Sequence, residues 1–105
     1  MTTQSINIRL ESESGKVLKE CSENYAEINN FLQHIDNYQN KYEYLAGIDE
    51  FGDTLFNYKQ VPKVIIELKK LLNEKLKFHT KTHIQLTIDF LKHIDIHKYI
   101  HFSGD

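Results

Sequence analysis

Cysteine, proline, glycine and long apolar runs are all scarce in this chain of 105 residues. Its one cysteine, Cys21, excludes an internal disulfide and a zinc site made of thiolates. One proline and four glycines exclude a fibrous or low-complexity chain. No apolar run is long enough to span a bilayer, and residues 1–5 lack the basic stretch and apolar run that open a secretory signal. We therefore expect a cytoplasmic protein with no membrane contact.

The composition that remains indicates one globular domain over residues 1–105. Hydrophobic residues make up 40% of the chain and charged residues 27%, which is typical of a folded rather than a disordered protein. The charge is unevenly distributed along the chain. Residues 1–58 hold four basic and ten acidic side chains, a net charge of −6, whereas residues 59–105 hold nine lysines and five acidic side chains, a net charge of +4. The two halves of a sequence need not be two faces of the molecule, so this pattern alone does not predict a dipolar surface.

Hydrophobic periodicity predicts the elements of an α+β fold. Alternation of apolar and polar residues predicts strands, and apolar residues at steps of three and four predict helices. The predicted strands cover residues 5–11, 16–21, 42–48, 54–58 and 98–102. The predicted helices run from an Asn24 cap, with Glu27 completing a capping box, to about residue 39, from Pro62 to Leu76, and from Thr80 or Thr82 to Ile94. The order β-β-α-β-(β)-α-α-β predicts a small, mainly antiparallel sheet covered by about three helices, with the last strand beside the N-terminal hairpin or the 42–48 strand.

Histidine spacing raises the possibility of a metal site. His79 and His83 are four residues apart, as are His93 and His97, and two histidines at this spacing on a helix can chelate a divalent cation. No Glu follows His79 as a zinc protease requires, and Lys81 would repel a cation. We therefore expect structural histidines, with neither a metal nor another cofactor. Cys21 lies near Glu20 and Glu23, whose charges oppose thiolate formation, so it is not expected to be a nucleophile.

The lysine-rich second helix raises the possibility of nucleic-acid binding. Residues 59–81 hold seven lysines and two glutamates, but the whole chain has a single arginine, Arg9. Recognition of nucleic acid normally adds arginine or interleaved aromatic side chains, and the sequence pI of about 6.3 is low for such a domain. A solvated lysine face is the favoured interpretation, and we do not expect nucleic acid as the partner.

The acidic turn, residues 47–54, is the most informative segment. It places Asp49, Glu50 and Asp53 around Phe51 and two glycines. The spacing does not fit an EF-hand loop. Two interpretations remain open: a turn in which carboxylates accept backbone hydrogen bonds, or a surface that binds a basic partner. Of the three carboxylates, we expect Glu50 to be the most exposed and Asp53 to accept a hydrogen bond that holds the turn.

Two motifs give the chain a resemblance to a group of small uncharacterised bacterial proteins. Those proteins share the pattern Ile-Asp-Pro-Tyr-Gly-Asp-Thr-hydrophobic-Phe-Asn, then a Gln, and they end in an aromatic-rich strand with Gly-Asp. The matching residues here are Ile48, Asp49, Gly52, Asp53, Thr54, Leu55, Phe56, Asn57 and Gln60, and Gly104 and Asp105 at the end. Glu50 and Phe51 replace the usual Pro-Tyr, and Ser103 replaces an aliphatic residue. The resemblance implies no established activity.

The size and surface of the chain resemble those of bacterial immunity proteins, which neutralise a toxin by binding it. We therefore expect a non-enzymatic protein-binding module. Its most concrete form is an immunity protein that uses Asp49, Glu50, Phe51, Asp53 and Asp105 to occlude a basic toxin domain. A small metal-dependent enzyme or regulator, using Asp49, Asp53, Asp105 and a histidine, is one alternative. A nucleic-acid-associated regulator that uses the lysine-rich helix is the other. The sequence indicates no oligomeric state.

Overall fold

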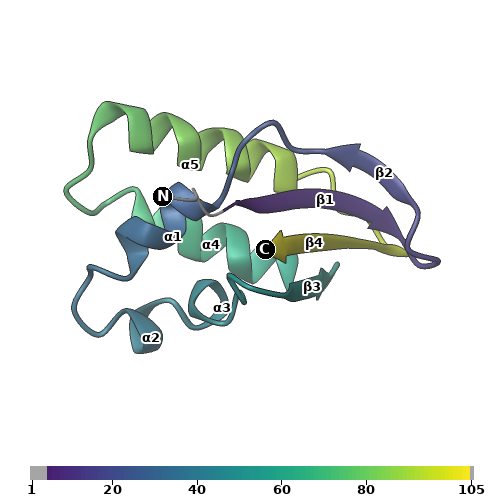
Figure 1. Cartoon of the computed structure of the whole chain (residues 1–105), viewed down its shortest axis with the longest axis horizontal. Coiled ribbons are helices and arrows are strands. Elements are labelled where there is room, and N and C mark those ends of the chain that lie inside the picture. The colour runs from purple at the N-terminus through teal and green to yellow at the C-terminus, as the bar shows by residue number, and fades with distance from the viewer. Residues whose placement is uncertain (1–4, 105) are drawn as a thin grey trace.

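The computed structural model of the chain describes residues 5–104, which form four strands and five helices (Figure 1). The elements are β1 (Ile6–Ser12), β2 (Val17–Glu20), α1 (Ala26–Leu32), α2 (Tyr38–Lys41), α3 (Glu43–Ala46), β3 (Asp53–Asn57), α4 (Val61–Leu71), α5 (Phe78–Leu91) and β4 (Lys98–Gly104). The predicted α+β class is confirmed. None of the helices in this part of the chain is long and apolar enough to cross a membrane.

The sheet has the strand order β2-β1-β4-β3, and every neighbouring pair is antiparallel. The first and last strands lie side by side at its centre, paired from Ile6 with Gly104 to Ser12 with Lys98. This confirms the predicted place of the last strand beside the N-terminal hairpin. The short strand expected after the acidic turn is β3, which forms one edge of the sheet, and β2 forms the other.

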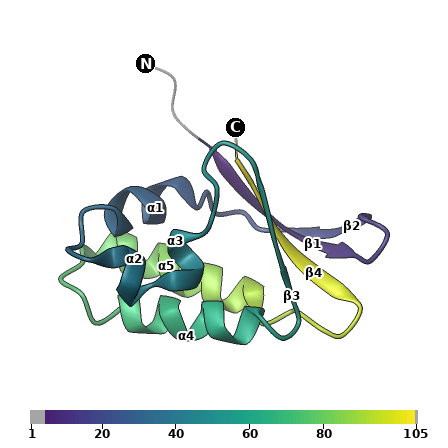
Figure 2. The same cartoon turned by 90° about the horizontal axis from the view of Figure 1, so that it is seen from below.

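The helices all lie on one side of the sheet, so that its other side, the outer face, has no helix over it (Figure 2). The alternation read from the sequence sets the two faces. Ile6, Ile8 and Leu10 of β1 point into the core, together with Ile100 and Phe102 of β4. Against them pack the buried stripes of α4 and α5, which are Val64, Leu68, Leu71, Ile84, Ile88 and Leu91.

The strand predicted over residues 42–48 is wrong, because Glu43–Ala46 is the short helix α3. The backbone N–H groups of its first turn donate to a carboxylate from another helix. The Glu67 side chain on α4 accepts hydrogen bonds from the backbone N–H groups of Tyr44 and Leu45, at 3.0 Å each. Negative charge at a helix N-terminus is also favoured by the helix dipole. Tertiary contact thus determines the local structure of a segment whose alternation fits a strand equally well.

The helix predicted from Asn24 to residue 39 is also divided. α1 ends at Leu32, and Asn37, at the left-handed φ of 61°, precedes the separate turn α2. Asn24 does accept a cap-like bond from the Ala26 N–H at 3.0 Å, but its carboxamide oxygen also accepts the Ile6 N–H of β1 at 2.8 Å. The third helix begins at Phe78, before both threonines that the sequence suggested as caps.

Candidate functional site

The acidic turn is held by hydrogen bonds at both of its ends. The Asp49 side chain accepts the Phe51 N–H at 2.9 Å, and the Asp49 N–H donates to the Thr54 hydroxyl, also at 2.9 Å. The Gly52 carbonyl accepts the Gly104 N–H at 2.7 Å, which attaches the turn to the end of β4. The turn is therefore a defined surface feature rather than a loose loop.

The two halves of the family-like motif meet in space at this point. A Cβ atom on Gly104 would overlap the backbone carbonyl of Glu50, so the strand end and the turn are in close backbone contact. At the far end of β3, the side chain of Asn57 accepts the Gln60 N–H at 3.0 Å, and the side chain of Gln60 accepts the Asn57 N–H at 2.9 Å. This reciprocal pair has the form of a capping box and leads the chain into α4. These contacts give most of the motif residues a structural role.

The five residues predicted as a binding site separate into different environments. Phe51 is 70% exposed, and Asp49 and Asp53 beside it are exposed as well. Glu50, which we expected to be the most exposed carboxylate, is half-buried and accepts a hydrogen bond from the buried Asn29 carboxamide at 3.2 Å. Asp105 lies outside the described residues.

Asp53 takes part in a contact that the sequence did not suggest. Its carboxylate lies 2.7 Å from Nε2 of His101 on β4, and the Glu11 carboxylate on β1 lies 2.6 Å from Nδ1 of the same ring. Asp53 was expected to hold the turn by accepting backbone bonds. Instead Asp49 does so, and Asp53 joins His101 and Glu11 in a triad that crosses three strands.

The His101 ring is protonated more readily than a free histidine. Partial burial disfavours its charge, but the hydrogen bonds and negative charges of Glu11 and Asp53 outweigh that effect and raise the pKa of His101 above its ordinary value. With both nitrogens facing carboxylates, each is best satisfied as an N–H donor. A ring engaged on both sides has no free nitrogen to act as a general base, so this triad favours a structural role over catalysis.

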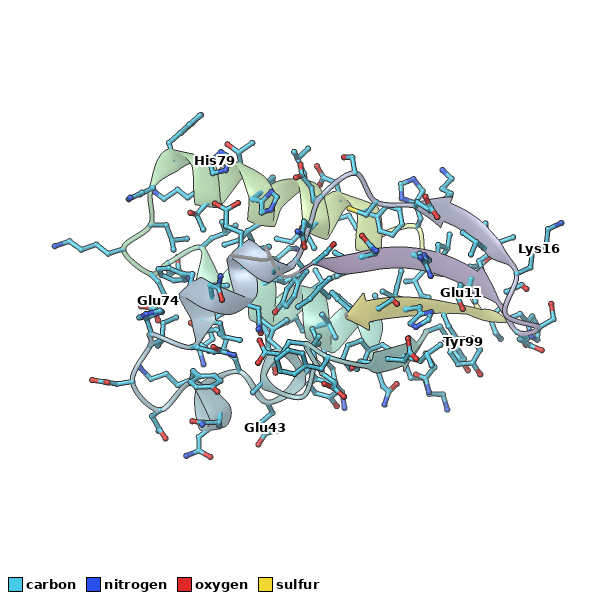
Figure 3. All side chains as sticks on the ribbon, in the orientation of Figure 1. Glu11, Lys16, Glu43, Glu74, His79 and Tyr99 are labelled. Carbon is cyan, nitrogen blue, oxygen red and sulfur yellow. The ribbon has the colours of Figure 1, made fainter. Side chains whose placement is uncertain are left out.

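The rest of the outer face is a mixed surface. Arg9 lies opposite His101 on β1, with its Nε 3.7 Å from the Glu20 carboxylate, and Leu55 of β3 lies opposite His101 on the other side. Leu55 is 52% exposed. Figure 3 shows Glu11 and Tyr99 of this surface on the neighbouring strands β1 and β4. The acidic turn and the outer side of β3 thus form one continuous region with two exposed apolar side chains, Phe51 and Leu55.

Features expected of a small-molecule or metal site are weak in the described part of the chain. One hollow has a volume of about 260 Å³ and is lined by Glu13, Asn57, Tyr58, His97 and Tyr99 among others. Ligand pockets usually start at about 300 Å³. Within residues 5–104 no three histidine, cysteine or acidic side chains are grouped so as to hold a metal ion. His83 instead contacts Glu23 at 2.6 Å and the carbonyl of Asn24 at 2.9 Å.

Comparison of the chain with protein-family models, with curated protein sequences and with solved structures finds no significant match.

Proposed function

We propose that the chain is a protein-binding module whose binding surface is the acidic turn together with the adjoining outer side of β3. In its most concrete form it is a cytoplasmic immunity protein that covers the substrate site of a basic toxin domain. The proposal is supported by the exposure of Phe51. Its aromatic side chain is 70% exposed and is flanked by the exposed carboxylates of Asp49 and Asp53.

An exposed aromatic ring surrounded by charged side chains is a common arrangement at protein–protein interfaces. Aromatic residues are enriched at the centres of interfaces and supply much of their binding energy, while rim charges speed association with an oppositely charged partner. The hydrogen bonds of Asp49 and Gly52 fix the turn before binding. A fixed loop loses less conformational entropy when a partner docks, which favours affinity.

The resemblance to small bacterial proteins supports the same proposal from the sequence side. At positions 50 and 51 the chain has Glu-Phe where that group has Pro-Tyr, so both have an aromatic residue at the tip of the turn. Under this proposal the tip of the turn contacts the partner, so a difference in side chains there changes which partner is bound.

The proposal is tested by growth rescue. A toxin domain encoded beside the gene for this chain is expressed in a bacterial host, with and without the chain, and colony formation is counted. The chain should restore growth, and Phe51→Ala should weaken binding to the purified toxin domain by about fivefold or more, because truncating a central aromatic typically costs over 1 kcal/mol.

Phe78→Ala is the matched control. Phe78 is 84% exposed at the start of α5. Figure 1 shows this end of α5 far from β3, the strand that follows the acidic turn. The Phe78→Ala variant should bind and rescue like the unaltered chain. Failure of the unaltered chain to rescue growth, or equal effects of the two substitutions, would contradict the proposed function or the proposed surface.

A further inference from the structure

The two edges of the sheet differ in how well they are protected against pairing with another strand. β2 has only four residues, contains or adjoins Lys16 and Lys19, and pairs with β1 through an irregular register between Leu10 and Glu11. Short length, lysines and bulges are the usual means of blocking an edge. β3 is also short, at five residues, but it pairs with β4 in continuous register from Asp53 to Asn57 and contains no lysine or proline.

The hydrogen-bond pattern shows which backbone groups of β3 face away from the sheet. The Gly104 N–H donates to the Gly52 carbonyl, so the even-numbered positions along this strand point to β4. The odd-numbered positions point outward, and the Asn57 N–H agrees because it donates to the Gln60 side chain instead of to β4. The outward N–H and C=O of Leu55 bond to no other residue among 5–104. Leu55 is thus the centre of an open edge.

Opposite charges border the two ends of this edge. Asp49 and Asp53 lie exposed where β3 begins. Lys59 and Lys63 lie exposed just beyond its end, with their ammonium groups 5.9 Å and 5.8 Å from the ring centroids of Tyr58 and Tyr44. The change of charge between residues 58 and 59 of the sequence therefore falls at the end of the open strand.

We propose that the partner of this chain binds by adding one strand, antiparallel, to the β3 edge. The occupant is an extended segment of a protein with an acidic residue first, an apolar residue two positions later opposite Leu55, and a basic residue a further two positions on, opposite Asp53. In this register the acidic residue meets the lysines after β3 and the basic residue meets Asp49 and Asp53. Main-chain bonds supply affinity in such strand addition, and the charges select register and direction. The proposal deepens the proposed function and depends on it only for the identity of the partner.

The test uses a synthetic peptide, so it does not depend on any toxin. The probe is acetyl-Ser-Glu-Thr-Val-Thr-Arg-Ser-amide, and the control peptide exchanges its Glu and Arg. Amide hydrogen exchange of the chain is followed by NMR as peptide is added. At a peptide concentration about ten times its Kd, the Leu55 amide should exchange about tenfold more slowly. Before peptide is added, the Leu55 amide should already exchange faster than the Thr54 amide, which faces β4.

The charge pattern predicts how affinity changes. The control peptide should bind about two- to fivefold more weakly, the range expected for cross-strand charge pairs. Lys59→Glu should reduce or reverse that preference, whereas Lys69→Glu, an exposed lysine on α4, should leave it unchanged. Binding with no slowing at Leu55, or no binding at peptide concentrations up to about 5 mM, would overturn the proposal. If the unaltered chain binds the peptide but does not rescue growth, the toxin assignment is contradicted and the strand-addition proposal is not.

Discussion

His101 shows how one side chain can connect strands that are distant in sequence. Glu11 on β1 and Asp53 on β3 contact its two ring nitrogens, while Arg9 lies opposite it and adds a positive charge nearby. The side chain of Glu11 is only 9% exposed, and that of His101 15%. A buried carboxylate is stabilised best when its partner carries a positive charge. The triad therefore connects the protonation of one ring to the stability of the outer face.

A pH dependence of stability follows from this contact. The pKa of His101 is raised in the folded protein, so the stabilisation is fully present below the unfolded value of about 6.5 and is lost as the pH rises through the folded value. Replacing the ring by His101→Gln removes this component. Urea unfolding at pH 6, 7, 8 and 9 should show the free energy of unfolding of the unaltered chain falling relative to that of the variant. Glu11→Gln should shrink the same difference, and parallel pH profiles for all three proteins would contradict the role of the triad.

The sequence contained part of the signal for this site. Alternation already places Glu11 and His101 on the side of their strands opposite the core residues, and that placement is confirmed. It could not show that the two strands are neighbours, because ninety residues separate Glu11 from His101. It also misassigned Glu50, whose exposure depends on the position of Asn29 in α1. Contacts between distant elements decide both cases.

At the scale of elements, the strongly periodic segments were predicted and the ambiguous ones were not. β1 and β4 agree with the alternation from which they were predicted, because it repeats over a buried face. β3 lies within one residue of its predicted position, and α4 begins within one residue of its predicted start but ends at Leu71, before the predicted end at Leu76. Tyr42, Tyr44, Ala46 and Ile48 alternate as in a strand, yet residues 43–46 form a helix. Glu67 accepts its amides, and the hydroxyl of Tyr42 donates to Glu74 at 3.0 Å. Neither partner lies within the segment, so no local pattern could reveal them.

The close contact between the end of β4 and the acidic turn can be tested with a pair of glycines. Gly104→Ala places a methyl group against the backbone of Glu50 and Asp49, which cannot move aside as a flexible side chain would. We expect a loss of about 1–3 kcal/mol in the free energy of unfolding, as overpacking usually causes. Gly47→Ala is the control, because its Cβ would lie an ordinary 3.5 Å from the nearest atoms. It should change stability by no more than about 0.5 kcal/mol in a urea melt. Equal effects of the two substitutions would contradict the close packing.

At the scale of the whole molecule, one core joins the sheet to every major helix. Leu68 of α4 has no exposed surface and belongs to the same buried cluster as Ile8 of β1, Ile88 of α5 and Leu45 of α3. Ile66, two residues earlier on α4, is 64% exposed. The helix thus offers one aliphatic residue inside the core and one outside it.

Truncating both side chains to alanine tests whether burial, rather than aliphatic character, determines the loss in free energy of unfolding. Leu68→Ala should lower the free energy of unfolding by about 2–5 kcal/mol, since it removes buried methyl groups and leaves a cavity. Ile66→Ala should stay within about 0.5 kcal/mol of the unaltered chain. Thermal unfolding followed by circular dichroism measures both. A loss at Leu68 no larger than the loss at Ile66 would contradict the placement of this face of α4 in the core.

The central pairing of β1 with β4 has a consequence for how the chain folds as it is made. The first strand leaves the ribosome long before its main partner, because the partner is the last strand of the sheet. Contacts between residues so far apart in sequence form slowly, since a long loop must close before any of them is made. Until then β1 can pair only with β2, and its apolar side remains open to other nascent chains or to chaperones. Completion of the sheet, and with it of the β3 edge and the acidic turn, therefore awaits the release of residues 98–104.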